Sequence, residues 1–194
     1  YLNREITYVI TTKKTYDADY VICSGDYHHF DQNILDEKFR NYSESYWDKR
    51  VLAPSSLLFY LGVSKKLEKL EHHTLFFDED IEKHSDDIYE KSVWPKKPLF
   101  YTCCPSKTDT KVAPKGKENL FILMPIAAGL KDTKKTREKY FEIIMNRLEK
   151  FCNLEIRKNI EYKKSYCTND FVEDYNAYKG NAYGLANTLM QTAN

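Results

Sequence analysis

Two short, strongly apolar stretches, separated by a polar segment rich in turn residues, dominate the hydrophobic pattern of the chain. The first runs from Leu99 to Cys104 and the second from Asn119 to Ala128. Short runs of aromatic and branched residues bounded by Pro and Gly predict strands rather than helices. Both runs are apolar at successive positions, so we expect two strands in the middle of a sheet, each covered on both faces.

Further strands are predicted on either side of this pair. Two β-prone runs, Glu5–Thr12 and Tyr16–Cys23, predict a hairpin. Leu57–Val63 predicts a strong third strand, and Thr74–Phe77 a short fourth one. Asn153–Tyr162 alternates apolar and polar residues, which predicts the last strand of the chain.

The remaining patterns predict helices. Asp26–Arg50 is polar and aromatic and predicts two short helices, whereas the acidic stretch Asp78–Lys91 predicts a surface helix. The clearest helix follows a cap at Asp132 or Thr133 and places Tyr140, Phe141, Ile144, Leu148 and Phe151 on one face. Thr168 is expected to cap a final helical turn. Because strands and helices are grouped rather than alternating, we expect an α+β fold with a mixed or mostly antiparallel sheet of about six strands and flanking helices.

Composition narrows the class of protein. The 194 residues carry a net charge of +1, which gives no electrostatic argument for binding nucleic acid. The longest apolar run, Leu120–Ala128, is far too short for a transmembrane helix. Five cysteines at irregular spacing do not suggest a disulfide framework, so a reducing, cytoplasmic location is expected.

The start of the sequence and the spacing of its glycines are informative about domain organisation. The sequence starts at Tyr1 next to a predicted strand, and none of its six glycines forms a Gly-x-Gly pair. A dinucleotide-binding fingerprint is therefore not present in these residues. We expect the chain to be an interior piece of a longer protein.

Candidate metal ligands occur as adjacent pairs, His28–His29, His72–His73 and Cys103–Cys104. Neighbouring side chains point to opposite faces of a strand and lie about 100° apart on a helix, so such pairs seldom bind one ion. Surface or partly buried side chains are the favoured interpretation, and no metal site is predicted. The acidic run Asp78–Asp80 is interpreted as a helix cap in preference to a cation site.

Aromatic residues are abundant on the predicted strands, and sixteen tyrosines are present in all. Phe59, Tyr60, Phe100, Tyr101 and Phe121 are ordinarily expected in a core. The alternative is the wall of an apolar channel, since ligand pockets are mostly apolar with few polar groups.

Several motifs, in order along nearly the whole chain, resemble one known family. They are Ala18–Ile22 followed by Ser24–Asp26, then Ala53–Gly62, then Pro98–Tyr101 with Cys104–Asp109, then Ala113–Pro114 and Gly116 with Asn119–Phe121, and finally Asn181–Leu185. Together these motifs are similar to those of the phytoene desaturase family, the FAD-dependent carotenoid desaturases of bacterial type.

The resemblance implies a discontinuous two-domain flavoenzyme, of which this chain is an internal fragment. Residues 1–26 resemble a hairpin of the flavin domain, residues 27–178 the substrate-binding domain of a flavin amine-oxidase-like enzyme, and residues 179–194 the return segment toward the flavin. Of these, Ser24, Gly25 and Asp26 would lie near the FAD. Because the main flavin motifs lie outside the chain, the fragment is expected to be inactive and not to hold FAD by itself.

The resemblance also implies a substrate and a setting. Enzymes of this family dehydrogenate CH–CH groups that flank the conjugated part of a long polyene such as phytoene, and pass the hydrogens to FAD. A long apolar groove is expected, with Tyr60, Leu123, Pro125, Tyr183 and Met190 as its candidate lining; the alternative is that a helix such as Tyr42–Arg50 covers that face. Peripheral contact with a membrane surface and self-association of an exposed apolar face are expected, and no catalytic acid or base is identified.

Two other functions fit the same residues. One is a related flavin-dependent enzyme, such as a carotenoid isomerase or a retinol saturase-like protein. The other is a non-catalytic lipid-binding module.

Overall fold

The computed structural model describes residues 6–192. The chain divides into two compact units, Tyr1–Arg50 and Val51–Asn194. The predicted domain boundaries at residues 26 and 178 refer to the domains of a parent enzyme and remain predictions. Of the predicted hairpin, only its first residue, Glu5, lies outside the described part of the chain.

The first unit begins with the predicted hairpin, in a shorter form. Strands β1 (Tyr8–Ile10) and β2 (Thr15–Asp17) pair antiparallel, and the Thr11 hydroxyl donates to the Lys14 carbonyl oxygen across the turn at 2.8 Å. The prediction that the second strand continues to Cys23 is wrong. Residues 18–24 belong to no strand, and Ile22 is 92% exposed.

Short helices complete the first unit, as predicted. They are α1 (Tyr27–His29), a π-helical turn (Phe30–Ile34), a 3-10 turn (Glu37–Phe39) and α2 (Glu44–Asp48). The buried Trp47 lies at their centre and is met edge-on by the rings of Tyr27, His28, Tyr42 and Tyr46. Its indole N–H donates to the buried Asp31 carboxylate, which also accepts from the backbone N–H groups of Asn41 and Tyr42. Burial alone would raise the pKa of Asp31, and these hydrogen bonds outweigh it and lower the pKa.

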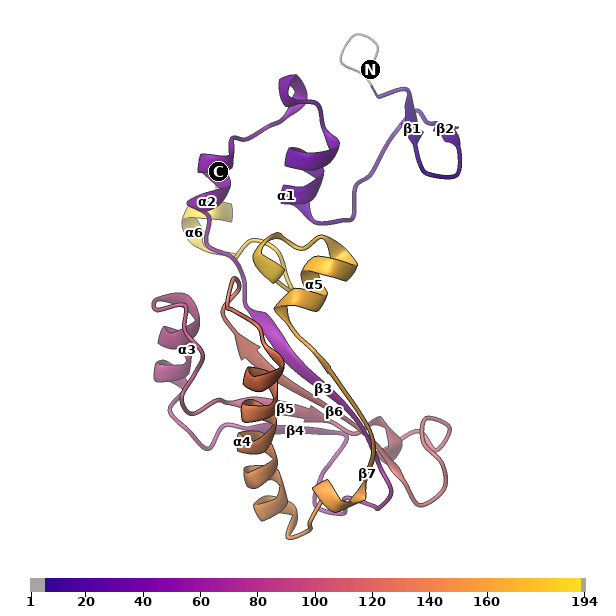
Figure 1. The fold of residues 1–194 in the computed structure, drawn as a ribbon, viewed down its shortest axis with the longest axis vertical. Coiled ribbons are helices and arrows are strands. Elements are labelled where there is room, and N and C mark those ends of the chain that lie inside the picture. Colours follow the sequence, from indigo (N-terminus) through magenta and orange to yellow (C-terminus); the bar gives the residue numbers. More distant parts are fainter. Residues whose placement is uncertain (1–5, 193–194) are drawn as a thin grey trace. The chain divides into compact units, whose positions relative to one another are not determined.

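The second unit is built on a five-stranded antiparallel sheet (Figure 1). Its strands, in spatial order, are β4 (His73–Phe76), β5 (Phe100–Cys103), β6 (Glu118–Ile126), β3 (Ser55–Val63) and β7 (Ile160–Tyr166). The two strands that the sequence places in the interior, β5 and β6, are indeed interior neighbours. The α+β class and the antiparallel sheet are confirmed.

Among the described residues of the second unit, four α-helices accompany this sheet. They are α3 (Ile81–Tyr89), α4 (Lys134–Cys152), α5 (Thr168–Tyr175) and α6 (Leu189–Thr192), with 3-10 turns at Pro105–Lys107, Arg157–Asn159 and Tyr178–Gly180. Thr133 caps α4 as predicted, accepting from the backbone N–H of Thr136 at 3.1 Å. At α5 the cap is Cys167, one residue before the predicted Thr168.

One predicted strand is misplaced. The alternating stretch Asn153–Tyr162 forms a strand only from Ile160 onward. Asn153 ends α4 in the left-handed conformation, and Ile156 is fully buried in the core from a loop position. The buried Ile156 therefore anchors a loop to the core. Alternation of apolar and polar residues alone does not show whether a stretch pairs with a neighbouring strand.

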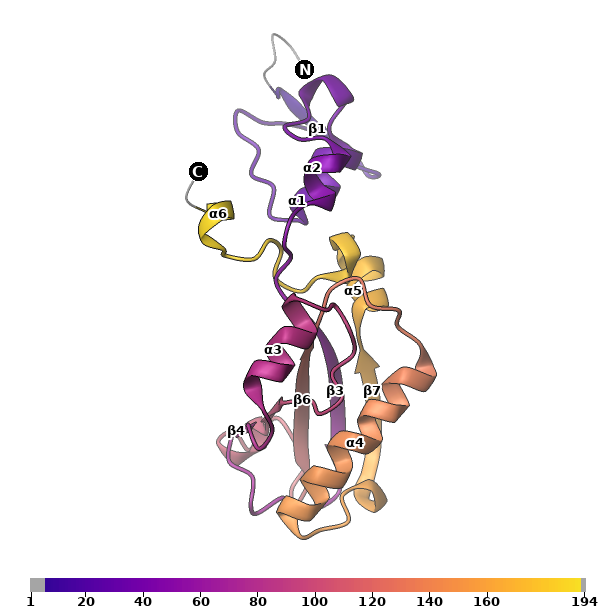
Figure 2. The ribbon, with the colours of Figure 1, turned by 90° about the vertical axis from the view of Figure 1, so that its left-hand side faces the viewer.

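The core lies between α4 and one face of the sheet. Leu57, Phe59, Leu61, Leu120, Ile122 and Met124 point into it and are at most 2% exposed. From α4 it receives Tyr140, Phe141, Ile144, Met145 and Leu148, whereas Phe151, also predicted on this face, is 44% exposed. Figure 2 shows α4 and α3 on opposite sides of the strands.

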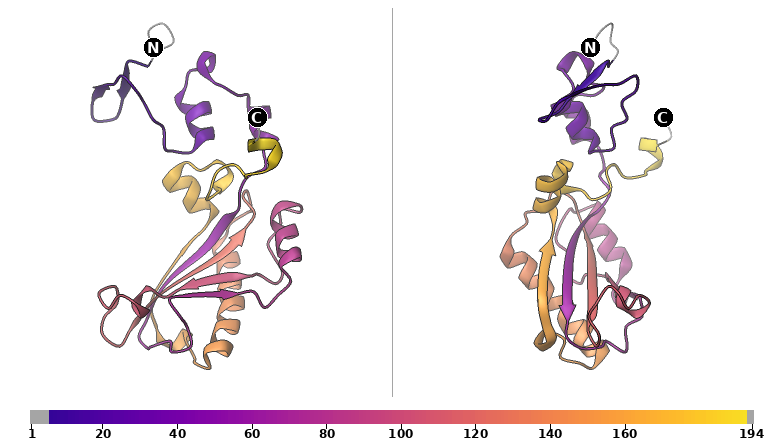
Figure 3. Two further views of the ribbon diagram at one scale, coloured as in Figure 1. Left: turned by 180° about the vertical axis from the view of Figure 1, so that it is seen from behind. Right: turned by 90° about the vertical axis from the view of Figure 1, so that its right-hand side faces the viewer.

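The expectation that both faces of the central strands are covered is wrong. Along β6, buried side chains alternate with partly exposed ones, so Ile122 and Met124 are buried while Phe121 and Leu123 are half-buried. Seen from behind, the strands β3 and β6 have no helix in front of them (left panel of Figure 3). Of the helices of the second unit, α3 contacts β6 and α5 contacts β3.

Candidate functional site

The partly exposed face of the sheet carries apolar and aromatic side chains from all five strands. Cross-strand pairing aligns Leu75 with Tyr101, Tyr101 with Leu123, and Tyr60 with Phe121, and side chains alternate between the two faces of a strand. We call this surface the open face and define it as Leu75, Tyr101, Phe121, Leu123, Tyr60 and Tyr162. Its outer members are well exposed, with Leu75 at 61% and Tyr162 at 57%.

The rings of the open face lie close to one another. The centroids of Tyr60 and Phe121 are 5.3 Å apart, and those of Tyr101 and Phe121 are 6.4 Å apart. Burial raises the pKa of Tyr60, and nearby Tyr175 of α5 adds to this effect, so the phenol stays neutral. The open face therefore offers a largely apolar surface with a few hydroxyl groups, and Lys164, the cross-strand partner of Tyr60, adds a charge at its β7 side.

A cleft continues the open face beneath α3. It has a volume of about 300 Å³ and shares Leu75 and Tyr101 with the open face. Its lining is completed by Pro54, Phe77, Ile81, His84, Ser85, Ile88, Tyr89, Leu99, Phe100 and Pro125. A mostly apolar cleft with few polar groups suits an apolar ligand, because such a ligand offers no hydrogen bonds to satisfy buried polar atoms.

His84 fixes α3 above this cleft. The side chain is 4% exposed; its Nδ1 accepts from the Leu99 backbone N–H at 2.9 Å and its Nε2 lies 3.0 Å from the Pro125 carbonyl oxygen. Only a neutral ring with its proton on Nε2 satisfies both partners. Burial lowers the pKa of His84, and the Pro125 carbonyl oxygen and Asp87 only partly oppose this, while Arg147 adds to the lowering.

We therefore expect acid to loosen α3 through His84. A lowered pKa means that the unfolded chain binds the proton more readily, so stability falls as the pH drops below the ordinary value of 6.5. In His84→Gln the amide can keep one acceptor and one donor without titrating. Urea unfolding at about pH 7.5 and about pH 5.5 should show a smaller acid loss for His84→Gln than for the unchanged chain. An identical acid loss in both proteins would contradict this role.

The turn at Cys104–Asp109, one of the motifs that carry the family resemblance, has a structural role. Glu118, at the start of β6, is 1% exposed and accepts from the Ser106 hydroxyl, while Lys107 Nζ lies 3.0 Å from its carboxylate. Burial alone would raise the pKa of Glu118, but these hydrogen bonds and the Lys107 charge outweigh it and lower the pKa. These contacts of Glu118 hold the loop between β5 and β6 against the first residue of β6.

The predicted flavin contacts lie in an exposed turn of the first unit. Ser24 and Gly25 are exposed, and the Asp26 carboxylate accepts from the His29 backbone N–H at 2.9 Å as the cap of α1. An added Cβ at Gly25 would meet nothing closer than 3.9 Å, so this glycine does not line a tight cradle. The contact of these three residues with FAD remains a prediction.

The structure brings together three of the five predicted substrate residues. Tyr60, Leu123 and Pro125 lie on the same face of β3 and β6, with Pro125 at the cleft. Tyr183 and Met190, which are 68% and 79% exposed, lie in the C-terminal segment rather than on the sheet. Their role as substrate contacts remains a prediction.

Sequence reasoning missed Leu75, Tyr162 and the α3 cleft. Leu75 lies on the short edge strand β4, whose sequence does not show which of its two faces is exposed. Tyr162 falls in the predicted strand Asn153–Tyr162, whose position differs from that of β7. The register between strands was the missing signal, because it decides which residues share a face.

The chain is similar to a segment of longer curated proteins. It is 44% identical to a carotenoid 3,4-desaturase of Haloarcula japonica over 92% of this chain and 36% of that protein. It is 32% identical to a 4,4'-diapophytoene desaturase of Staphylococcus haemolyticus over 90% of this chain and 36% of that protein. No family profile matches the chain. The chain thus spans about a third of the length of these relatives, and the resemblance predicted from its motifs is confirmed.

A solved structure supports the fold. An oxidoreductase from Methanosarcina mazei superposes with a TM-score of 0.50 at 14% identity, over 85% of this chain and 35% of that protein. At this identity the likeness concerns the fold alone. Among the described residues, no helix combines the length and apolarity needed to cross a membrane.

Proposed function

Because the chain corresponds to a segment of the carotenoid desaturases, we propose that it forms the substrate-binding part of an FAD-dependent enzyme that dehydrogenates phytoene-like polyenes. The observation that carries this proposal is the open face with the α3 cleft beside it. An apolar surface of this kind, formed by residues of five strands, suits a long hydrocarbon held by shape and apolar area.

The residues of the open face would orient the polyene and exclude water from it. Tyr60, Phe121 and Leu123 offer apolar contacts along β3 and β6, and the α3 cleft offers a pocket for one part of the substrate. In such enzymes the flavin accepts the hydrogens removed from a CH–CH group, whereas the protein supplies binding and orientation. The substrate dissolves in lipid, so we propose peripheral contact with a membrane surface, made by exposed apolar residues.

A chimera tests the proposed function. The corresponding segment of the Haloarcula japonica desaturase would be replaced by this chain, and the products formed from a polyene would be analysed. Introduction of new double bonds supports the proposal. Isomerised but equally unsaturated products would favour the isomerase alternative. Folded, flavin-loaded chimera with no product from the polyene would overturn the proposal.

We also expect the isolated chain to bind FAD weakly. The turn Ser24–Asp26 is exposed, its carboxylate already caps α1, and no Gly-x-Gly pair is present. Titration of FAD fluorescence with the purified chain should show no saturable binding below about 1 μM, where binding would release about 8 kcal/mol. Tight, saturable binding would show that these residues form a flavin site after all.

A further inference from the structure

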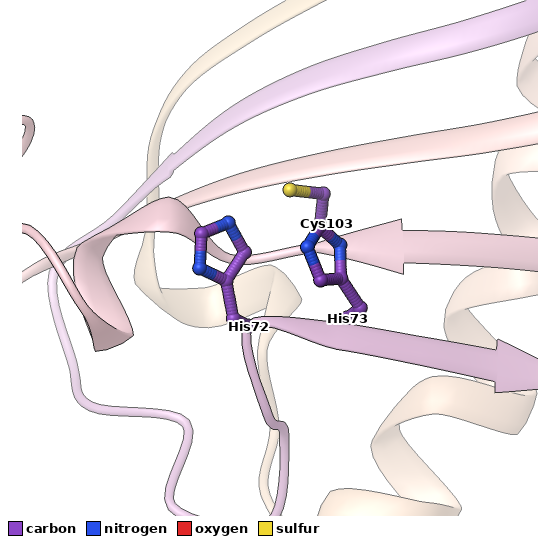
Figure 4. A group of neighbouring side chains, drawn as sticks. All are labelled: His72, His73 and Cys103. Carbon is purple, nitrogen blue, oxygen red and sulfur yellow. The ribbon is translucent and has the colours of Figure 1, made fainter.

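Three potential metal ligands come together at the edge of the sheet. The ligand atoms of His72, His73 and Cys103 all lie within 4.8 Å of one another. His73 and Cys103 are paired residues of β4 and β5, and His72 directly precedes β4 (Figure 4). From these observations we propose that His72, His73 and Cys103 form a binding site for a borderline-soft divalent ion of the zinc class.

The local backbone explains why a histidine doublet can act together here. His72 lies in a bend, not in the strand, and its carbonyl oxygen accepts from the Cys104 backbone N–H at 2.7 Å. Alternation between faces therefore does not apply to this pair, and the two imidazole rings stack with centroids 4.2 Å apart and an angle of 25°. The argument from the sequence, that adjacent histidines in a strand point to opposite faces, therefore does not hold for His72 and His73. Cys104, in contrast, is buried beside Glu118 and takes no part.

The donor set matches the chemistry of such an ion. Two imidazole nitrogens and one thiolate are the ligands that zinc prefers, and a fourth position would be left for water. Zn–N bonds of about 2.0 Å and Zn–S bonds of about 2.3 Å would draw the ligand atoms together by roughly 1 Å. His73 is exposed and the other two side chains are half-buried, so this adjustment needs only side-chain rotation.

Each histidine also has the supporting contact that ligating histidines use. His72 Nδ1 lies 2.7 Å from the Thr108 hydroxyl, and His73 Nδ1 lies 2.5 Å from the Tyr101 hydroxyl. A hydrogen bond at one ring nitrogen orients the ring and leaves Nε2 for a metal. Because Thr108 belongs to the loop between β5 and β6, an ion here would tie that loop to the edge strand β4. This inference does not depend on the proposed desaturase activity.

Cobalt and zinc titrations of the purified, metal-free chain test the site. Cobalt bound by Cys103 should give a cobalt–thiolate absorption band at one equivalent, and zinc should displace it. Cys103→Ser should abolish the band, and His73→Gln should weaken zinc affinity at least ~10-fold. Cys23→Ser is the matched control, since Cys23 is an exposed cysteine of the first unit and should leave both readouts unchanged.

Thermal unfolding gives a second readout. Zinc should raise the melting temperature of the unchanged chain and of Cys23→Ser, because a ligand that binds the folded state stabilises it. It should not raise that of Cys103→Ser, whose circular dichroism spectrum checks that it folds. Absence of saturable binding, a band that survives Cys103→Ser, or a band lost in Cys23→Ser would each overturn the proposal.

Discussion

Replacing Arg137 by Ala should destabilise the second unit by about 3–5 kcal/mol. Arg137 Nε donates to Asp132 Oδ1 at 2.7 Å, its Nη2 donates to the second oxygen of Asp132, and Nη2 also donates to Asp170 Oδ2 at 2.6 Å. The Asp132 side chain is only 1% exposed, so the substitution leaves a buried carboxylate without its charge partner. Such an uncompensated charge is far more costly than the loss of a surface ion pair.

The same contacts explain why the effect should spread beyond one helix. Arg137 lies in the first turns of α4, Asp132 in the preceding loop, and Asp170 in α5, where its carboxylate also accepts from the Cys167 backbone N–H at 2.8 Å. Urea unfolding measures the loss. Lys134→Ala on the same helix is the control, because Lys134 is exposed and its removal should stay within about 0.5 kcal/mol. Equal midpoints for the two variants would show that the network contributes little.

Ile122→Ala and Leu123→Ala should differ sharply although the two residues are neighbours and isomers. Ile122 is fully buried against α4, and its truncation should cost about 2–5 kcal/mol. Leu123 belongs to the half-buried open face, so its truncation should cost about 1 kcal/mol. The sequence analysis predicted that this strand is covered on both faces, in which case the two truncations would cost about the same.

The comparison is internally controlled, since both variants remove the same number of carbon atoms from one strand. Urea unfolding of the two variants and of the unchanged chain gives the two losses. Equal losses would show that the face carrying Leu123 is covered as fully as the core, which contradicts an open face.

Local patterns predicted the elements that depend on local chemistry. The period of α4 and its Thr133 cap were readable because a helix face and a cap involve residues three or four positions apart. The two central strands were readable because their apolar runs are bounded by Pro and Gly. The motifs that carry the family resemblance were recognisable because each is a contiguous stretch of sequence.

Features that depend on pairing between distant residues were not predictable. The start of β7 at Ile160 depends on its pairing with Val63, and the exposure of the Leu123 face depends on which helices reach it. The approach of His72 to Cys103 depends on a bend before β4 and on the β4–β5 register. Each requires the tertiary fold, which overrides a local pattern.

The central claim is that the open face holds a long apolar polyene, and binding of a C40 polyene to the purified chain tests it most directly. The polyene would be dispersed in detergent, and the amount that co-elutes with the protein would be read from its absorbance. Phe121→Asp places a charge in the middle of the open face and should weaken binding at least ~10-fold. Tyr20→Asp, at a residue of the first unit that is 90% exposed, is the control.

Circular dichroism would establish that both variants fold, and Tyr60→Asp on the neighbouring strand would repeat the test. The account predicts that the unchanged chain and Tyr20→Asp retain the polyene while Phe121→Asp and Tyr60→Asp lose it. Equal retention by all four proteins, or no retention by the unchanged chain, would contradict the assignment of the open face as the substrate wall.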